Sequence, residues 1–291
     1  MKIALVIASR GRPQLLAAVL RHWAEQSCVP NCRVISLSSP GDIEELSDGL
    51  VEMVLVGTAG LCLQRNRALD ALMPSDTEIV IFVDDDYIPS RNFVQNVSEL
   101  FSHHHDIAVA TGKMLADGVT CGGIDYTAAV RMVEKYDAMP EEPPWVMVDR
   151  GGGYGCNMVI RWSANRTIRC DERLPLYGWQ EDVDYTRQYL SYGRIVDTNA
   201  FAGVHMGSQG ARSPGKRLGY SQIVNPVYLM RKGTMPAWLG IKIMINNVLA
   251  NLRGTMLGDA KVDRGGRLKG NLLGIAHILL GRLMPEYVLK L

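Results

Sequence analysis

The chain has 291 residues, and 47% of them are apolar. This fraction can fill a sizeable core, so the composition excludes a disordered chain and allows one large α/β domain, or a domain with a helical appendage. No run reaches the roughly 18 consecutive apolar residues that a membrane-spanning helix needs. The net charge is only +1, and the basic residues lack the interleaved aromatics of a nucleic-acid-binding surface, so no nucleic-acid partner is expected.

The cysteines predict the compartment of the protein. There are six, none in a paired CxxC spacing, and no secretory signal precedes them. Disulfides form mainly in oxidising compartments, so we expect reduced thiols and a cytoplasmic location.

Strands and helices are expected to alternate over the first hundred residues. Residues 2–8 are predicted to form a buried strand, and residues 14–26 have the apolar periodicity of a helix. Later segments repeat this pattern, with strands expected at 33–38, 51–56 and 78–83 and helices at 60–72 and 90–103. Such alternation favours a mostly parallel sheet flanked by helices.

The chain from residue 107 to residue 217 is predicted to be less regular. Strands are expected at 107–111, 145–148, 157–161 and 201–204, a helix at 181–192, and an insertion that faces a substrate at 107–144. Residues 207–217 form a basic, glycine-rich segment that is predicted to be a mobile loop. Either Arg212, Lys216 or Arg217 closes over a diphosphate, or the segment is a solvated linker.

Three consecutive aspartates, Asp84, Asp85 and Asp86, directly follow the apolar run at 78–83. They are therefore expected at the carboxyl end of a buried strand, where open α/β sheets bind ligands. Carboxylates this close raise one another's pKa unless a cation is present, and oxygen ligands favour Mg²⁺ or Mn²⁺. The alternative is a solvated acidic turn that caps the next helix.

A second acidic cluster, Glu181, Asp182 and Asp184, opens the helix predicted at 181–192. Carboxylates at a helix N-terminus are stabilised in their charged form by the helix dipole, which is one explanation of the cluster. The other explanation is a general base that deprotonates a hydroxyl group.

Six segments resemble glycosyltransferase family 2, a large group of nucleotide-sugar transferases with the GT-A fold. They occur in the order of that family and span about residues 1–205: IASRGRP at 7–13, QRNRAL at 64–69, FVDDDYIP at 82–89, GCNM at 155–158, YGWQEDVD at 177–184, and His205. The resemblance implies a Rossmann-like, mostly parallel sheet flanked by helices, with a C-terminal helical extension. It also implies a nucleoside-diphosphate-sugar donor and a glycan or lipid-linked acceptor.

The resemblance assigns roles to individual residues. Asp86 is expected to bind the metal together with His205, whereas Asp84, Asp85 and Arg65 would contact the nucleotide. Asp182 aligns with the usual general base and Glu181 is its alternate. The remaining expected contacts are Ser9, Arg10 and Ser38 for the nucleotide and Trp179 for the acceptor sugar.

One position departs from the family pattern. Many members carry an aspartate after the second strand that reads the nucleobase, whereas this chain has Ser38, followed four residues later by Asp42. Either residue is a candidate for that contact, and uridine is the default base.

These expectations together describe an inverting, metal-dependent glycosyltransferase, because an activated hydroxyl that attacks the anomeric carbon in line inverts its configuration. The alternative is a catalytically silent subunit that binds a nucleotide-sugar or glycan within a synthesis complex. Residues 1–217 are predicted to form the catalytic domain and residues 218–291 an amphipathic helical region.

The tail is distinctly basic. From residue 236 onwards there are eight Lys and Arg against three Asp and Glu, in blocks that alternate with apolar residues. Such helices can lie on an anionic membrane surface, here the inner face of the membrane, or they can pair with another subunit in a homo-oligomer.

Overall fold

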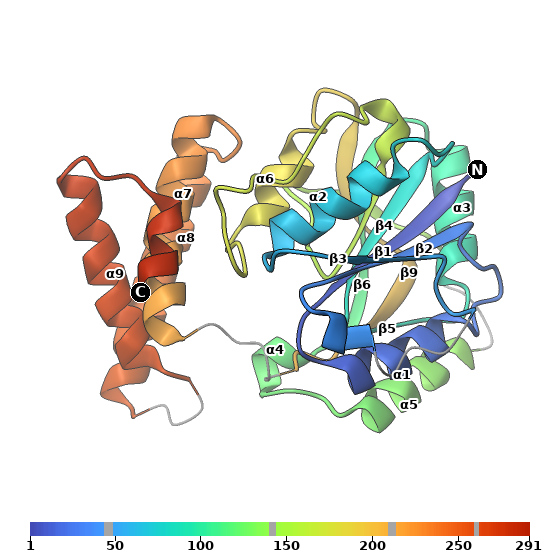
Figure 1. Ribbon diagram of the computed structural model, residues 1–291, viewed down its shortest axis with the longest axis horizontal. Coiled ribbons are helices and arrows are strands. Elements are labelled where there is room, and N and C mark those ends of the chain that lie inside the picture. Colours follow the sequence, from blue (N-terminus) through green and yellow to red (C-terminus); the bar gives the residue numbers. More distant parts are fainter. Residues whose placement is uncertain (44–48, 140–143, 209–213, 259–261) are drawn as a thin grey trace. The chain divides into compact units, whose positions relative to one another are not determined.

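The structure, a computed structural model, describes the chain except for residues 44–48, 140–143, 209–213 and 259–261 (Figure 1). The chain divides into two compact units. The first comprises Met1–Ala59, Gln64–Arg169 and Thr186–Ala211, and the second Gly60–Leu63, Cys170–Tyr185 and Arg212–Leu291. The predicted boundary after residue 217 stays a prediction.

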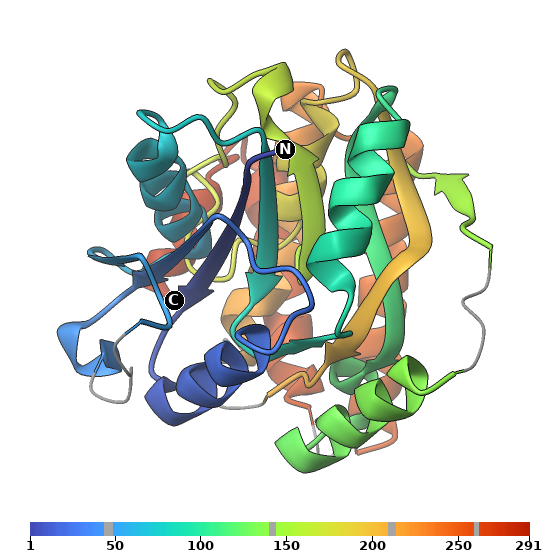
Figure 2. The ribbon, with the colours of Figure 1, turned by 90° about the vertical axis from the view of Figure 1, so that its right-hand side faces the viewer.

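The first unit is built on one mixed sheet. Its strands are β1 (Ile3–Ser9), β2 (Cys32–Leu37), β3 (Met53–Val56), β4 (Ile79–Asp84), β5 (Tyr87–Pro89), β6 (Ile107–Asp117), β7 (Met147–Asp149), β8 (Asn157–Arg161) and β9 (Arg194–His205). The order is β3-β2-β1-β4-β8-β6-β9-β5, with β7 also paired to β9, and Figure 2 shows it from the blue N-terminal strands to the gold β9. The first four strands are parallel, and β8 runs antiparallel to both of its neighbours.

Helices cover both faces of this sheet, with α2 on one face and α1 and α5 on the other (Figure 1). The helices of the chain are α1 (Pro13–Trp23), α2 (Leu61–Leu72), α3 (Phe93–His103), α4 (Gly118–Cys121), α5 (Tyr126–Asp137), α6 (Glu181–Arg187), α7 (Gly215–Lys232), α8 (Ala237–Met256) and α9 (Arg264–Leu279), with short 3₁₀ turns at Pro40–Ile43, Trp162–Ala164 and Pro285–Lys290. The predicted α/β architecture, with a helical extension at its C-terminal end, is thereby confirmed.

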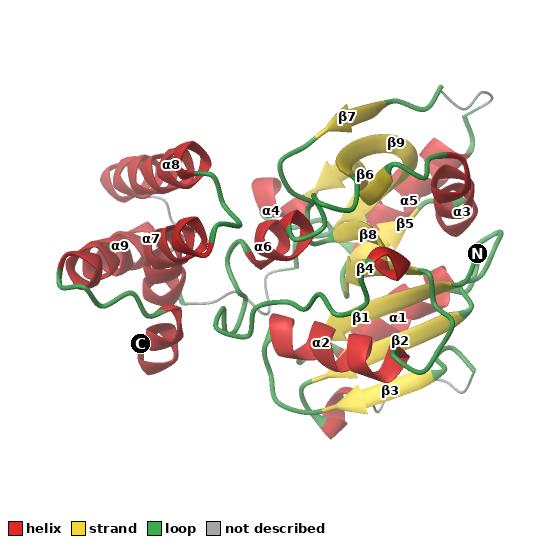
Figure 3. Cartoon of the chain, turned by 90° about the horizontal axis from the view of Figure 1, so that it is seen from above, coloured by secondary structure: helices red, strands yellow, loops and turns green. Residues whose placement is uncertain are grey.

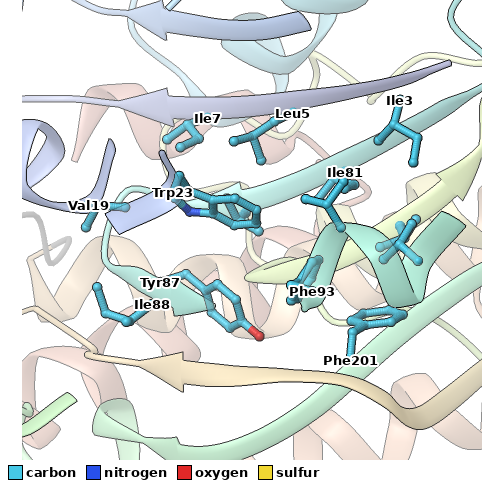
Figure 4. Packing of buried hydrophobic residues seen from close by; sticks show 14 of the residues in the cluster. Ile3, Leu5, Ile7, Val19, Trp23, Ile81, Tyr87, Ile88, Phe93 and Phe201 are labelled. Carbon is cyan, nitrogen blue, oxygen red and sulfur yellow. The ribbon is translucent and has the colours of Figure 1, made fainter. Parts of the chain in front are cut away.

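Large apolar side chains fill the core between the sheet and α1, α3 and α5. Alternate residues of β1 point to this side, and the Phe93 ring packs against Trp23 and Phe201, with ring centroids 5.4 and 4.6 Å apart (Figure 4). Burying one such side chain contributes roughly 1.5–3 kcal/mol. This core holds the strands in register and so fixes the edge of the sheet where they end.

Several predicted boundaries are wrong, and each has a physical reason. The helix expected from residue 90 begins at Phe93, because β5 pairs with β9 and the Ser90 amide donates to the Ala202 carbonyl at 2.9 Å. The expected insertion at 107–144 is largely regular structure. Strand β6 continues for six residues beyond the strand predicted at 107–111, and helix α5 follows it. The predicted strand at 201–204 is the end of the 12-residue β9.

The second unit contains the long helices α7, α8 and α9 (Figure 3). No helix in the described part of the chain is both long and apolar enough to cross a membrane. The prediction of a loop through residue 217 is wrong for its last three residues, because α7 begins at Gly215 and therefore includes Lys216 and Arg217. Arg212 lies outside the described residues.

Candidate active site

The carboxyl ends of four strands bring polar side chains together at one edge of the sheet in the first unit, with β8 lying between β4 and β6. Ser9 ends β1, Asp84 ends β4, Asp117 ends β6 and His205 ends β9. Strand register aligns Asp84 with the residue before Ser9, and Asp117 with His205. This edge of an α/β sheet is where ligands usually bind, because loops and helix starts meet there.

Asp85 is an internal anchor of this edge. Its side chain is 1% exposed, and its two oxygens lie 2.5 Å from the Arg12 guanidinium and 2.5 Å from the Ser9 hydroxyl. Burial raises the pKa of Asp85 to about 7, although the nearby Arg12 charge opposes this effect. Asp85 therefore holds the loop after β1 against the loop after β4.

Asp86 is held by three different donors. The His205 Nε2 lies 3.3 Å from Oδ1, the Arg12 Nη1 lies 3.3 Å from Oδ2, and the backbone amide of Ser208 donates to Oδ2 at 2.7 Å. Burial acts to raise the pKa of Asp86, but the contacts with His205 and Arg12 outweigh it and lower the pKa to about 2. Asp86 is thus a carboxylate at neutral pH.

His205 joins the aspartates of two strands. Its Nδ1 lies 3.0 Å from Asp117 Oδ1, and its Nε2 faces Asp86 and, at 3.6 Å, Asp84. Burial acts to lower the pKa of His205, but the three carboxylates raise it to about 10. Asp117 also accepts hydrogen bonds from the Tyr154 hydroxyl and the Val119 amide.

The donor set of Asp84, Asp86 and His205 fits a divalent cation. One ligand atom from each residue lies within 4.8 Å of the other two, a spacing at which one ion can contact all three. The Asp117 carboxylate fixes the Nδ1–H of His205, as is usual for metal-binding histidines, so Nε2 is the atom that would bind an ion after losing its proton. Two carboxylates and one imidazole suit Mn²⁺, with Mg²⁺ as the harder alternative.

Arg65 lies beside this cluster and is almost fully buried. Its Nη2 donates to the Gly155 carbonyl at 2.9 Å, lies 3.7 Å from Asp84 Oδ1, and the guanidinium stacks near the Phe82 ring. The preceding residue, Gln64, donates to the carbonyls of Ser9 and Ser36 and thereby ties α2 to the ends of β1 and β2. The structure therefore brings the expected Arg65 and Asp84 together.

The loops after β1 and β2 also meet. Asp42 is buried, and its carboxylate accepts from the Gly11 amide at 2.8 Å and from the Ser38 hydroxyl at 3.4 Å. Gly11 has φ 67°, a conformation that favours glycine, so the chain can turn its amide towards Asp42. Arg10 is exposed in the same turn.

The second acidic cluster belongs to the second unit. Asp184 is fully buried, with one oxygen 2.7 Å from Lys232 Nζ and the other 2.6 Å from the Thr234 hydroxyl. Lys232 also lies 2.7 Å from Asp171, and although burial acts to lower the pKa of Lys232, the two carboxylates raise it. These contacts hold the start of α6 against the end of α7.

The remaining acidic residues of α6 differ in exposure. Glu181 is buried, and Asp182 is half-buried and accepts from the Val183 amide at 2.8 Å. The segment before them is strained, because Leu176 and Gln180 have φ values of 61° and 71° without being glycines. Such strain persists only where the surroundings impose it, often at functional sites.

Three more expected residues lie in the second unit. Trp179 is half-buried, packs near Tyr177, and its carbonyl accepts from Asn225 at 2.9 Å. Lys216 is exposed and Arg217 half-buried in the first turn of α7. Their proposed contacts with donor and acceptor stay predictions.

Sequence reasoning missed three participants of the first cluster. Arg12 bridges Asp85 and Asp86, Asp117 orients His205, and the Ser208 amide binds Asp86. Only Arg12 had a visible signal, since it stands in the polar turn that breaks the first strand. Asp117 is the last residue of the 11-residue β6, whereas the strand was predicted to end at residue 111, so the sequence did not place Asp117 at this edge of the sheet.

Comparisons with known proteins support the fold. No family model and no curated protein match the sequence. Among solved structures, TarS from S. aureus has a TM-score of 0.51 at 20% identity over 77% of this chain. The mannosyltransferase PcManGT from Pyrobaculum calidifontis, in complex with GDP-Man and Mn²⁺, has a TM-score of 0.54 at 12% identity over 99% of this chain and 78% of its own. GalNAc-T7 with UDP, GalNAc and Mn²⁺ has a TM-score of 0.50 at 14% identity over 78% of this chain and 50% of its own.

The chain spans 40% of the length of TarS, and 66% of a shorter TarS chain that was also solved with UDP. At these identities the similarity concerns the fold. The protein has a GT-A-like glycosyltransferase fold, with an Asp-x-Asp motif at the carboxyl edge of its sheet.

Proposed function

We propose that the protein is an inverting, metal-dependent glycosyltransferase of the family 2 type. It transfers a sugar from a nucleoside-diphosphate donor to a hydroxyl group of a glycan or a lipid-linked acceptor. The observation that carries this proposal is the cluster of Asp84, Asp86 and His205 at the carboxyl edge of a GT-A-like sheet.

The first cluster binds the donor diphosphate. Asp84, Asp86 and His205 would hold Mn²⁺ or Mg²⁺, and the ion would supply positive charge to the phosphate oxygens of the leaving group. Asp117 keeps His205 oriented, and the Ser208 amide and Arg12 keep Asp86 in its ionised form. Arg65 approaches the same diphosphate from the start of α2, beside Asp84.

The turn that joins Gly11, Ser38 and Asp42 is the proposed contact for the nucleoside. Asp42 is buried, and its carboxylate accepts from both the Gly11 amide and the Ser38 hydroxyl, so it can supply the carboxylate that position 38 lacks. Ser9 and Arg10 precede this turn. Solved proteins of similar fold were crystallised with UDP-GlcNAc or with GDP-Man, and uridine stays the default base for this chain.

Asp182 is the proposed general base, with Glu181 as its alternate. Its carboxylate takes the proton from the acceptor hydroxyl while the oxygen of that hydroxyl attacks the anomeric carbon and the nucleoside diphosphate leaves. One displacement of this kind inverts the anomeric configuration. Buried Asp184, fixed by Lys232 and Thr234, holds the helix that carries Asp182, and Trp179 offers an apolar face to the acceptor sugar.

The donor class can be found by thermal unfolding of the purified protein with UDP, GDP, dTDP or CMP, each with and without Mn²⁺. A ligand that binds only the folded state raises the unfolding temperature. We expect one nucleotide to raise it, and to do so only with the metal. If none of the four has any effect in the presence of Mn²⁺, the donor-binding role is contradicted.

A donor screen does not separate an enzyme from a silent subunit. The nucleotide-sugar of the base identified above should therefore be incubated with the protein and Mn²⁺, and release of the nucleoside diphosphate measured with and without candidate glycan acceptors. We expect acceptor-dependent release. Tight metal-dependent binding without release would favour a silent nucleotide-sugar-binding subunit.

A further inference from the structure

Helix α8 exposes a continuous apolar stripe. Six large side chains follow one another at spacings of three or four residues and therefore lie on one face of the helix. Their exposed fractions range from 43% to 80%, and they are Trp238, Ile241, Ile245, Leu249, Leu252 and Met256. In α9, Leu272, Ile275 and Leu279 repeat the pattern, with exposed fractions of 61%, 40% and 82%.

Glycines and amides make much of the contact between the helices, beside an apolar cluster that includes Tyr220, Val224, Leu273 and Ile278. A Cβ atom on Gly219 of α7 would lie 2.0 Å from the Arg267 carbonyl oxygen of α9, and one on Gly270 would lie 2.2 Å from the Lys216 carbonyl oxygen. Only glycine allows the two backbones to approach this closely. The buried residues of α8 are Gly240 and Asn251 alone.

Three buried amides link all three helices. Asn251 donates to Gln222 and to Asn271, each at 2.9 Å, and Asn271 donates to the Gly219 carbonyl at 2.7 Å. Helices of water-soluble proteins usually bury their large apolar side chains and expose polar ones. Close glycine contacts and amide hydrogen bonds inside, with leucine and isoleucine outside, are typical of helices that face lipid.

A groove between α7, α8 and α9 continues this surface. It has a volume of about 410 Å³, and its lining residues are all aliphatic or methionine, among them Ile223, Met244, Val248 and Ile278. Ile245, Leu249, Ile275 and Leu279 of the exposed stripes also line it. The groove and the stripes therefore form one apolar face.

Basic side chains flank this face. Lys242 and Arg253 of α8 each adjoin a residue of the stripe, and Lys269, Arg282 and Lys290 are also exposed. Long basic side chains can keep their charge at the level of lipid headgroups while their stems cover apolar surface. A second copy of the chain on this face would bring two sets of like charges together, whereas an anionic bilayer complements them.

We propose that the apolar face of α8 and α9 docks onto an anionic lipid bilayer, with the two helices lying in the interface rather than crossing it. The finding that no described helix is fit to span a membrane agrees with this arrangement. The proposal extends the proposed function by placing the enzyme on the surface that carries a lipid-linked acceptor, here the inner face of the membrane. Its physical basis is the surface itself and does not depend on catalysis.

The test is co-sedimentation of the full chain with vesicles, either of phosphatidylcholine alone or of equimolar phosphatidylcholine and phosphatidylglycerol. We expect binding to the anionic vesicles that weakens as salt is added. The double variant Ile245→Ser/Leu249→Ser should lower the partition coefficient by about tenfold or more, because membrane binding scales with the apolar area inserted. Lys242→Ala should lower it by about fivefold on anionic vesicles only.

Val148→Ser is the matched control, since Val148 is 55% exposed on β7 in the first unit. Its binding should equal that of the unsubstituted chain. Circular dichroism and thermal unfolding of each variant show whether it is folded. Ile241→Ser/Leu252→Ser is a second pair on the same stripe if the first fails to fold.

Two results would overturn the docking proposal. The first is the absence of binding, in which the unsubstituted chain stays in the supernatant with anionic vesicles, or equal binding of these vesicles by the unsubstituted chain and the stripe variants. The other is a dimer in solution that the stripe substitutions dissociate, without any vesicle binding, which would assign the face to a second copy. Metal-dependent nucleotide binding is measured without vesicles, so failure of docking leaves the proposed function standing. Likewise, failure of nucleotide binding would leave the docking proposal standing, because vesicle binding is measured without nucleotide.

Discussion

The two acidic clusters differ in what balances their charge. In the first, Asp85 and Asp86 share the Arg12 guanidinium, and Asp86 also faces His205. In the second, Lys232 is the cation that the structure places on Asp184, while Asp182, two residues earlier, is half-buried on the same helix. The first cluster offers converging ligand atoms from two carboxylates and one imidazole, which suits it to bind a metal. A carboxylate on an anchored helix is suited to move a proton.

The largest expected effect comes from the proposed base. Asp182→Asn keeps the size and shape of the side chain but removes its ability to accept a proton, so we expect sugar transfer to fall by about 10²–10⁴-fold. Metal-dependent nucleotide binding should be unchanged, because the first cluster is intact. Both are measured on the same preparation, with the exposed Asp149→Asn as the control. Normal transfer by Asp182→Asn would shift the role to Glu181.

The first cluster responds in the opposite way. Asp86→Ala removes a proposed ligand and the partner of His205, so calorimetry should show nucleotide affinity in Mn²⁺ falling by at least about tenfold. Binding measured without metal should change less. Asp76→Ala, which removes an exposed aspartate, should behave as the unsubstituted chain. If Asp86→Ala binds the nucleotide as tightly as that control, Asp86 is not a metal ligand.

A second substitution beside the proposed metal site tests the role of Asp117. Asp117→Asn removes the charge that orients the His205 ring, and the loss of such an outer partner typically lowers metal affinity by about 10–100-fold. Mn²⁺ affinity is the quantity to measure. Tyr154→Phe removes a hydroxyl that donates to the same carboxylate and should have a much weaker effect. Equal effects of the two substitutions would point to a general loosening of the site.

The smallest expected effect concerns the anchor of the second cluster. Lys232→Met leaves Asp184 buried without its cation, and we expect the free energy of unfolding to fall by about 1–3 kcal/mol, since the Lys232 side chain is partly solvent-screened. Arg231→Met, an exposed neighbour on α7, is the control. Denaturant unfolding measures both variants.

This stabilisation should also depend on pH. Burial acts to raise the pKa of Asp171, but its hydrogen bonds with Lys232 and Tyr228 lower it, so its contribution is present above the unfolded pKa of about 3.9 and is lost as the pH falls. The pKa of Lys232 is raised, so its contribution is present below about 10.4 and is lost as the pH rises further. The difference between the unsubstituted chain and Lys232→Met should therefore be largest between these limits. A difference that does not change down to pH 3 would contradict the ion-pair explanation.

The sequence predicted the parallel half of the sheet and the position of the first cluster. Both depend on local signals, namely aliphatic runs such as that of β4 and the aspartates that directly follow it. The pairing of β5 with β9, the length of β6 and the helix α5 depend on contacts between distant segments, which local patterns do not encode. Asp84 and Arg65 stand in local motifs and were therefore predicted as site residues. Asp117 was missed because its position depends on the contact between β6 and β9.

In the second unit, the periodicity of apolar residues predicts helices but does not predict which way their apolar faces point. Its apolar spacing predicted amphipathic helices, but the same spacing allows the apolar face to point inwards or outwards. The glycines and amides that pack α7 against α9 decide between these alternatives, and their contacts are visible only in three dimensions.

Asp84, Asp86 and His205 are proposed to bind a divalent cation together with a nucleotide. Electron paramagnetic resonance of Mn²⁺ tests this proposal directly, because the signal of the free aqueous ion is lost when the ion is bound. We expect the protein to bind one Mn²⁺ more tightly when UDP or GDP is present, and we expect Asp86→Ala to abolish this gain. Equal Mn²⁺ binding by the unsubstituted chain and Asp86→Ala, with either nucleotide, would contradict the account.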